Sequence, residues 1–241
     1  MKTARSTKAT KHARRAGRAA QGRRRCDDRP RLHPIEGTLE RQLERRILAA
    51  FERLDMDAPW ADLAPTILPV IRRVIQPYPA DVTPLTITVP PGIPTGFGID
   101  MGPAFSHVTA AMVGSWAIDS ATILATALDN LRHLVADEPP LVDPLVIEGH
   151  PVLAVQGQGW GSALILLPDV LAGILGPDPR VLITPVRNTL VALPETVDAD
   201  LVIDLWSVIA HGRHDELDID PLRWTGTDVV AISDRSRRLV H

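Results

Sequence analysis

The sequence predicts an α+β fold in which helices pack on a mixed or largely antiparallel sheet. Short runs with period-two alternation recur along the chain, and several of them are joined by tight turns into hairpins beside helical patterns. The 241 residues are 45% hydrophobic and 23% charged, close to globular averages, and the chain is long enough to bury a substantial core. Hairpins beside helices favour this class over a doubly wound parallel sheet.

Charge and hydropathy divide the chain into a disordered basic arm over residues 1–30, a helical segment over 31–76 and an α+β domain over 77–241. Residues 1–25 contain ten Lys or Arg and no acid, which leaves 16 basic against 29 acidic residues and a net charge of −13 for the rest. The arm has almost no apolar side chains beyond alanine, and its like charges repel, so we expect it to be disordered.

The helical segment begins with an amphipathic pattern over Thr38 to Leu54. Its apolar stripe consists of Leu39, Leu43, Ile47, Leu48, Phe51 and Leu54. A second helix is predicted over Ala61 to Val74, interrupted near Pro65 and Pro69 because proline has no amide hydrogen to donate.

The first part of the α+β domain contains much loop. Residues 77–102 are dense in Pro and Gly, and within them Leu85–Val89 alternates as a strand does. A second strand is predicted over His107–Val113. Asp119 is a typical N-cap, so we expect a helix from there to Val135.

The second part alternates between hairpins and helices. A hairpin is predicted over Leu145–Gln156, with its turn at Gly149-His150-Pro151. The later elements expected are a helix over Ser162–Leu175, strands over Val181–Thr184 and Thr189–Leu193, a helix over Asp200–Ala210, and a closing hairpin from Leu222 to Ser233.

Composition excludes several kinds of chemistry. All three lysines lie in the arm, so residues 26–241 offer no Schiff-base lysine, lysine general base or P-loop lysine. Cys26 is the only cysteine, which excludes an intramolecular disulfide and agrees with a reducing cytoplasm. No signal peptide is evident, and the apolar stretch Val108–Leu128 is interrupted by Gly114 and Asp119, so we expect a cytoplasmic protein with no membrane span.

The region from Trp116 to Ile232 resembles the YtpQ-like family of uncharacterised bacterial proteins, a domain of unknown function. The resemblance rests on the order of four motifs. The first is Trp116-Ala117-Ile118-Asp119, which precedes a predicted helix that ends in Asn130-Leu131-Arg132. The other three are Gly159-Trp160-Gly161-Ser162-Ala163-Leu164-Ile165-Leu166, then Thr184-Pro185-Val186-Arg187-Asn188-Thr189-Leu190, and finally Pro221-Leu222-Arg223-Trp224. Asn188 and Gly161 depart from the family pattern, and the arm has no counterpart in it. The resemblance implies a cytoplasmic bacterial protein with this mixed fold, and it implies no activity.

A glycine-rich turn over Gly157–Ser162 is the first candidate site. It follows an apolar strand and precedes a predicted helix, so amides around Gly159, Gly161 and Ser162 could hold a phosphate or carboxylate, with Arg187 as a bidentate partner. The spacing G-x-G-x-G differs from the dinucleotide fingerprint. The alternative is a tight turn with an N-cap serine.

A second candidate is a divalent metal site at His211, His214 and Asp215, where imidazole and carboxylate ligands lie close in sequence. His133 is available as a further ligand. The segment follows a helix end marked by Gly212, so the alternative is a polar loop.

The arm is the third candidate, because ten cations over residues 1–25 would attract nucleic acid non-specifically through counterion release. No aromatic residue is interleaved to stack on bases. A solvated tail, a translated upstream extension and an organellar transit peptide are the alternatives.

These signals favour a non-catalytic binding or interaction module over an enzyme. Ser162 lies outside a nucleophile elbow, and the lone cysteine lies in the arm. The alternatives are an enzyme or binder of an anionic small molecule at Gly157–Ser162 and Arg187, and a nucleic-acid-associated protein. No cofactor is indicated by the sequence.

Overall fold

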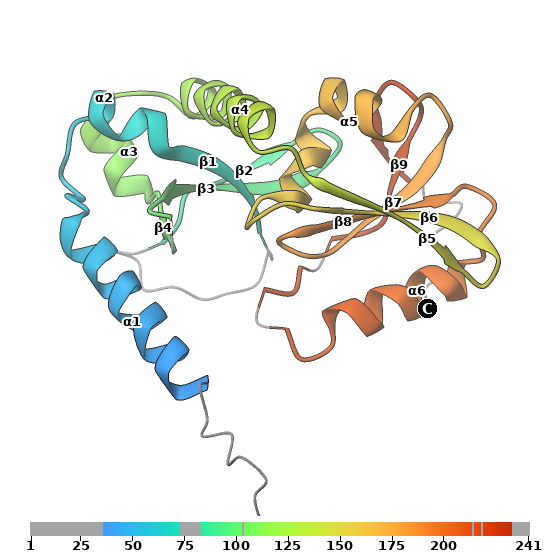
Figure 1. Cartoon of the computed structure of the whole chain (residues 1–241). Coiled ribbons are helices and arrows are strands. Elements are labelled where there is room, and N and C mark those ends of the chain that lie inside the picture. The colour runs from blue at the N-terminus through green and yellow to red at the C-terminus, as the bar shows by residue number, and fades with distance from the viewer. Residues whose placement is uncertain (1–35, 73–82, 103, 214, 218, 233–241) are drawn as a thin grey trace, which may run out of the picture. The chain divides into compact units, whose positions relative to one another are not determined.

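The strands of this protein form two antiparallel sheets with helices packed against them, so the fold is α+β (Figure 1). The structure is a computed structural model, and it describes residues 36–72, 83–102, 104–213, 215–217 and 219–232. Contacts divide the chain into a unit of residues 1–40 and a unit of residues 41–241. The second unit contains every element described below, except for the first residues of helix α1 (Glu36–Arg53).

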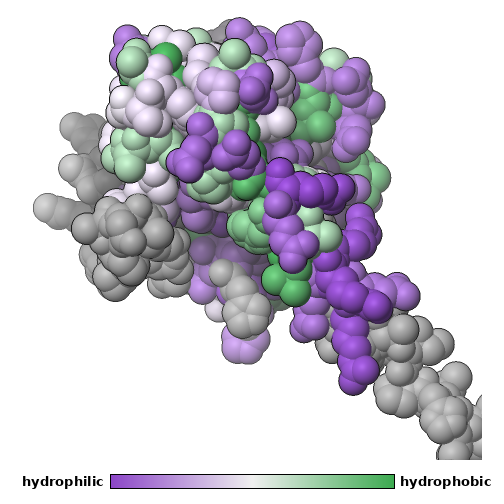
Figure 2. Space-filling model, turned by 90° about the vertical axis from the view of Figure 1, so that its left-hand side faces the viewer, coloured by the Kyte–Doolittle hydropathy of each residue, from purple (hydrophilic) through white to green (hydrophobic). Residues whose placement is uncertain are grey.

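Helix α1 leaves much of its predicted apolar stripe in solvent. Leu43, Leu48 and Phe51 are exposed, whereas Ala50 is buried. Figure 2 shows apolar surface beside strongly hydrophilic surface in the region of this helix. An amphipathic pattern therefore predicted the helix correctly without predicting the burial of its stripe.

The first sheet contains four strands, with β3 paired to the other three. They are β1 (Ile67–Ile71), β2 (Thr86–Val89), β3 (Ile93–Asp100) and β4 (Phe105–His107). Helix α4 (Ser120–Asp137) packs against β1 through Ile123, Ala127, Leu131 and Val135. Figure 1 shows this helix lying along one face of the sheet.

The predicted helical segment of residues 31–76 is wrong at its C-terminal end, because Ile67–Ile71 forms β1 instead of a second helix. Only α2 (Trp60–Leu63) and the 3-10 helix η1 (Ala64–Thr66) precede the strand. All five residues of β1 are buried, so no period-two alternation marked it in the sequence. Pro69 fits because β1 lies at the edge of its sheet, where one side needs no amide hydrogen.

Two further predictions in this region are wrong. Ile93–Asp100, expected to be loop, is the central strand β3, in which Gly96 and Gly98 give room to the side chains of Arg72 and Phe105. The strand expected over His107–Val113 ends at His107 and is followed by helix α3 (Ala110–Trp116), because Thr109 accepts the amide hydrogen of Met112 at 3.2 Å and caps it.

The predictions for β2 and for the Asp119 cap are confirmed. β2 lies within the expected run, and the Asp119 carboxylate accepts the amide hydrogen of Thr122 at 2.7 Å. Asn130, in the middle of α4, donates its side-chain amide to the carbonyls of Ala64 and Ile67 at 2.7 and 2.9 Å. The helix thereby fixes the point at which η1 turns into β1.

The second sheet contains six strands in the order β10-β9-β7-β8-β6-β5. They are β5 (Leu141–Ile147), β6 (His150–Gln156), β7 (Arg180–Val186), β8 (Thr189–Pro194), β9 (Leu222–Trp224) and β10 (Val229–Ala231). The β5–β6 and β9–β10 pairs are the two predicted hairpins, although β5 begins at Leu141 and not at Leu145. Strands β7 and β8 contain the two strands predicted over Val181–Thr184 and Thr189–Leu193. Glu148 and Gly149 form the first turn, with φ of 50° and 81°, so that turn lies one residue before its predicted place.

Helices cover both faces of this sheet. Helix α6 (Ala199–Ala210), close to its predicted bounds, packs on one face through Val202 against Val152 and Ile183. The helix predicted over Ser162–Leu175 is instead a buried 3-10 helix η3 (Gly161–Leu166) and helix α5 (Pro168–Leu175), on the other face (Figure 1). Pro168 has no amide hydrogen to continue η3, and it takes the first position of α5.

A single core cluster joins the two sheets. Leu68, Ile71 and Ile93 from the first sheet are buried together with residues of η3, α5 and the second sheet. By length and composition, no individual helix of the described ranges could cross a membrane, although the pair formed by α3 and α4, bent by 100°, could do so together.

Candidate functional site

Each glycine of the turn over Gly157–Ser162 lies against another part of the chain. A side-chain carbon added to Gly157 would lie 2.6 Å from the Trp160 ring, and one added to Gly161 would collide with the backbone carbonyl of Asn188. Gly159 has a φ of 78° and lies under the ring of Phe105. Close packing therefore explains all three glycines.

The structure brings this turn together with Arg187, as the anion-site hypothesis requires. Arg187 and Asn188 form the turn between β7 and β8, and their carbonyls accept the amide hydrogens of Ser162 and Gly157, each at 3.0 Å. Those two amides are therefore bonded to the protein. The helix that should supply a dipole is the six-residue η3, and Ser162 is 1% exposed, with no hydrogen-bond partner for its hydroxyl among the described residues.

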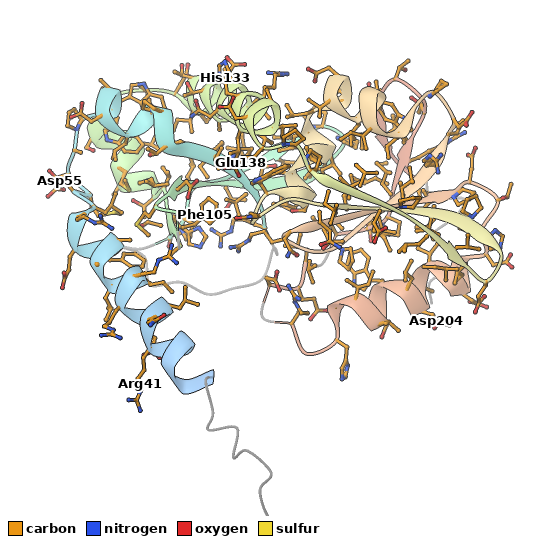
Figure 3. The ribbon with its side chains drawn as sticks, in the orientation of Figure 1. Arg41, Asp55, Phe105, His133, Glu138 and Asp204 are labelled. Carbon is orange, nitrogen blue, oxygen red and sulfur yellow. The ribbon has the colours of Figure 1, made fainter. Side chains whose placement is uncertain are left out.

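A shallow hollow of about 290 Å³ lies beside the turn. Figure 3 labels Glu138, which lies on its rim just before β5. The lining combines one carboxylate, three side-chain amides and an indole, from Glu138, Pro139, Leu141, Gln156, Gly157, Gln158, Trp160 and Asn188. The amides both donate and accept hydrogen bonds, and Glu138 is the one charged residue of this lining, so the hollow suits a cationic group better than an anion.

Strand β5 continues from this hollow along the edge of the second sheet, and six of its seven residues are exposed. Leu141 and Leu145, 63% and 39% exposed, lie on the α6 face, whereas Val142 and Val146, 38% and 75% exposed, lie on the α5 face. They are four of the ten large hydrophobic residues that are exposed in the described part of the chain. An edge strand that exposes large apolar side chains on both faces is uncommon.

The register fixes which backbone groups of β5 point outward. In a two-residue hairpin the pair that flanks the turn, Ile147 and His150, is hydrogen-bonded, and bonded and non-bonded pairs then alternate. Val142, Pro144 and Val146 therefore point their backbone groups away from β6. The edge offers the amide hydrogens of the two valines and the carbonyls of all three residues, and among the described residues no strand pairs with it there.

Arg72, His107 and Arg187, called here the Arg–His–Arg cluster, converge from three separate segments. Arg72 follows β1, and its side chain crosses Gly96; His107 ends β4 opposite Gly98. Arg187 reaches the cluster from the second sheet, and all three side chains are half-buried. Phe105, labelled in Figure 3, lies two residues before His107 on the same strand.

Burial and two positive neighbours keep His107 neutral. Loss of solvent, followed by the charges of Arg72 and Arg187, lowers the pKa of His107 to about 4. At neutral pH the two guanidinium groups carry the charge of the cluster, and the imidazole has one donor and one acceptor nitrogen.

The metal-site residues are placed less favourably. Both carboxylate oxygens of Asp215 accept hydrogen bonds from the guanidinium of Arg213, at 3.0 and 3.2 Å, and these bonds hold the pKa of Asp215 below its usual value. His211 lies exposed after α6, and His214 is outside the described residues. Within the described ranges, no group of three His, Cys, Asp or Glu residues is arranged to hold a metal ion, so His133 does not join such a group either.

Sequence reasoning missed Arg72 and His107. Neither belongs to a motif, and their proximity depends on the pairing of β1 and β4 with β3. The basic arm of residues 1–25, the nucleic-acid candidate, lies outside the described residues.

Comparison with known proteins gives no identification. No protein-family model matches this sequence, and searches of curated proteins and of solved structures find no match. The resemblance to the YtpQ-like family therefore stays a prediction.

Proposed function

We propose that this chain is a non-catalytic interaction module, which binds an extended, basic segment of a partner protein as an added strand along β5. The observation that carries the proposal is the edge of β5, which exposes large apolar side chains on both faces, with Asp143 between the two leucines, and keeps outward-pointing backbone groups. Addition of a strand to a sheet edge gains affinity from main-chain hydrogen bonds and specificity from alternate side chains.

The charge around β5 favours a basic partner. Residues 133–179 contain no Lys or Arg, whereas the hairpin and the residues just before it carry Asp137, Glu138, Asp143 and Glu148. Complementary charge speeds association and disfavours acidic competitors. A segment that alternates apolar with basic residues would place one set on the exposed leucines or valines and bring positive charge to these carboxylates.

The hollow at the start of β5 supplies an end point for such a segment. Leu141 belongs both to the strand and to the hollow, so a strand added along the edge would lead directly into it. Glu138, Gln156 and Asn188 offer oxygen acceptors there, which suit the donors of an arginine or lysine side chain. The proposed setting is the bacterial cytoplasm, in agreement with the lone cysteine.

A binding experiment tests the proposal with a labelled peptide in which valine alternates with arginine, measured by fluorescence anisotropy. Val146→Pro removes one outward amide hydrogen, and Val146→Thr is the matched control, because it keeps the backbone and the β-branch. We expect the proline variant to lose about 3- to 10-fold in affinity, the value of one net hydrogen bond, and the threonine variant to bind nearly as wild type does.

The same peptide with glutamate in place of arginine should bind more weakly, and Glu138→Gln should reduce that preference. Equal affinity of Val146→Pro and Val146→Thr would overturn strand addition. Self-association of the unliganded protein that Val146→Pro abolishes would identify a second copy of this chain as the occupant, against the proposed basic segment.

A further inference from the structure

We propose that the partner segment adds antiparallel to β5 in one register, which places an arginine or lysine side chain directly opposite Asp143. This register rests on the strand addition proposed above, and it states which feature the partner segment must carry. Strand β5 is the outermost strand of the second sheet, and its two exposed faces differ in chemistry (Figure 1).

The α5 face of β5 is entirely apolar, whereas the α6 face carries one charge. The α5 face consists of the two valines of the strand and Pro144. On the α6 face, Asp143 lies between Leu141 and Leu145. An added strand would therefore meet only apolar side chains on one face and a carboxylate between two leucines on the other.

Within its row of the sheet, Asp143 has only apolar neighbours. Its cross-strand neighbour on β6 is Ala154, and the row continues through Val191 of β8 and Ile183 of β7. Asp143 itself is exposed. A strand added at the edge extends this row by one residue, so the side chain that the partner places there lies next to the carboxylate.

The hydrogen-bonding register brings that partner residue close to Asp143. The outward-pointing backbone groups belong to Val142, Pro144 and Val146, so an antiparallel strand forms its hydrogen-bonded pairs with these three residues. The pair at Asp143 is then a non-hydrogen-bonded one, in which the two Cα atoms lie about 4.5 Å apart and the side chains are closest. Opposite charges in such a pair stabilise the pairing of the strands.

Antiparallel addition continues the arrangement of the sheet, because every pair among its described strands is antiparallel. A parallel strand has evenly spaced, slanted bonds and forms no close pair of this kind. Pro144 lacks an amide hydrogen, so the residue opposite it gains one bond, whereas those opposite Val142 and Val146 gain two each. Of the residues of β5 on the α6 face, only Asp143 is charged, so a single basic residue selects the register.

The two leucines suit the stem of the same side chain. Leu141 and Leu145 flank Asp143 on its face and are 63% and 39% exposed. Arginine and lysine bury their methylene stems along apolar surface and keep the charged group in water. A glutamate at this position would bring a shorter stem and a like charge. The partner pattern is therefore apolar residues for the α5 face and a long basic residue for the centre of the α6 face.

Fluorescence anisotropy with two labelled peptides and the full-length protein tests this register. Both peptides alternate valine with threonine, and the central threonine is replaced by arginine in one and by glutamate in the other. We expect the wild type to prefer the arginine peptide by about 3- to 10-fold. Asp143→Asn should remove most of this preference, and Asp143→Arg should invert it.

Glu148→Arg is the matched control, because it makes the same change of charge in the turn after β5. Five residues of strand span about 16 Å, which exceeds the Debye length at physiological salt, so this variant should keep the wild-type preference within about twofold. An equal loss of preference in Asp143→Arg and Glu148→Arg would overturn the register, because the general acidic field would then explain it. An Asp143→Asn protein that self-associates and keeps the preference would overturn it too, because the carboxylate would then only guard an exposed edge.

The Val146→Pro and Val146→Thr variants, measured with the arginine peptide, separate this register from strand addition itself. Equal affinity of these two variants would overturn both proposals. A weaker proline variant, together with an Asp143→Arg protein that still prefers the arginine peptide, would overturn the register alone.

Disulfide cross-linking measures the direction of the added strand. The protein carries Leu145→Cys together with Cys26→Ser, because Cys26 is the only native cysteine. Two arginine peptides carry a cysteine either two residues before or two residues after the arginine, and oxidised glutathione is the oxidant. In the antiparallel register the residue opposite position 145 precedes the arginine by two, and a non-hydrogen-bonded pair has the Cα separation of a disulfide. We expect the first peptide to cross-link faster; faster cross-linking of the second would overturn the proposal.

Discussion

The ring of Phe105 lies 2.8 Å from the position that a side-chain carbon on Gly159 would occupy. This contact joins β4 of the first sheet to the turn that follows β6 of the second. The glycine that looked like part of an anion-binding motif is therefore needed for packing between the sheets.

Gly159→Ala should destabilise the fold by roughly 2–4 kcal/mol, because the new methyl group meets Phe105 and the backbone already has a φ of 78°. Gly149→Ala is the matched control: its φ is 81°, but nothing lies within 4 Å, so strain alone should cost about 1 kcal/mol. Urea denaturation measures both. Phe105→Leu should recover part of the loss in Gly159→Ala, and equal effects of the two alanines would contradict the contact.

Unfolding free energy should fall between about pH 6.5 and pH 4 through His107. The pKa of this residue is about 4 in the folded protein and 6.5 in the unfolded chain, so the unfolded state binds up to one more proton in that window. The contribution is complete above pH 6.5 and is lost as the pH falls through 4. Chemical denaturation at pH 7 and pH 5 measures the difference, which His107→Gln should reduce. An unchanged pH dependence in that variant would mean that His107 titrates normally.

Asn130→Leu should cost about 1–3 kcal/mol, because the carbonyls of Ala64 and Ile67 lose their shared donor. Asn130→Asp keeps the shape but sets an acceptor against two acceptors, so it should be at least as damaging. Asp129→Ala, which removes only an exposed ion pair to Arg132, should change stability by less than about 1 kcal/mol. Thermal denaturation ranks the three, and an Asn130→Leu protein as stable as Asp129→Ala would contradict this role.

Trp224→Phe should lower stability by about 1–3 kcal/mol, since the buried indole donates to the carbonyl of Gly176 at 2.9 Å, just after α5. Arg223→Gln, one residue away and half-exposed, should have a much smaller effect. A calorimetric melting curve compares the two, and matching midpoints would show that the indole hydrogen bond adds nothing.

The sequence predicts elements whose signals are local. The hairpins of the second sheet follow from alternation and turn residues, and the start of α4 follows from one side chain, Asp119, bonded three residues ahead. The sequence does not reveal β1 and β3 in this way, because both strands are buried on both faces and show no alternation of polar and apolar residues. The glycines of β3 are explained only by the side chains of Arg72 and Phe105, which come from other strands or their ends. Arg187 was found because it belongs to a local motif, whereas Arg72 and His107 come together only once β3 has paired with β1 and β4.

The backbone at the end of β7 is bonded to residues that are synthesised later than the strand itself. The amide of Arg187 bonds to Asp215, and Pro185 accepts a hydrogen bond from Leu217 at 2.9 Å, so the end of β7 is held by residues made about thirty positions later. On the ribosome, the turn between β7 and β8 can form early as a local hairpin. The backbone at the end of β7 gains these two bonds only after residue 217 has emerged, so a nascent chain that stops before that point would have the hairpin without the bonds that hold its end.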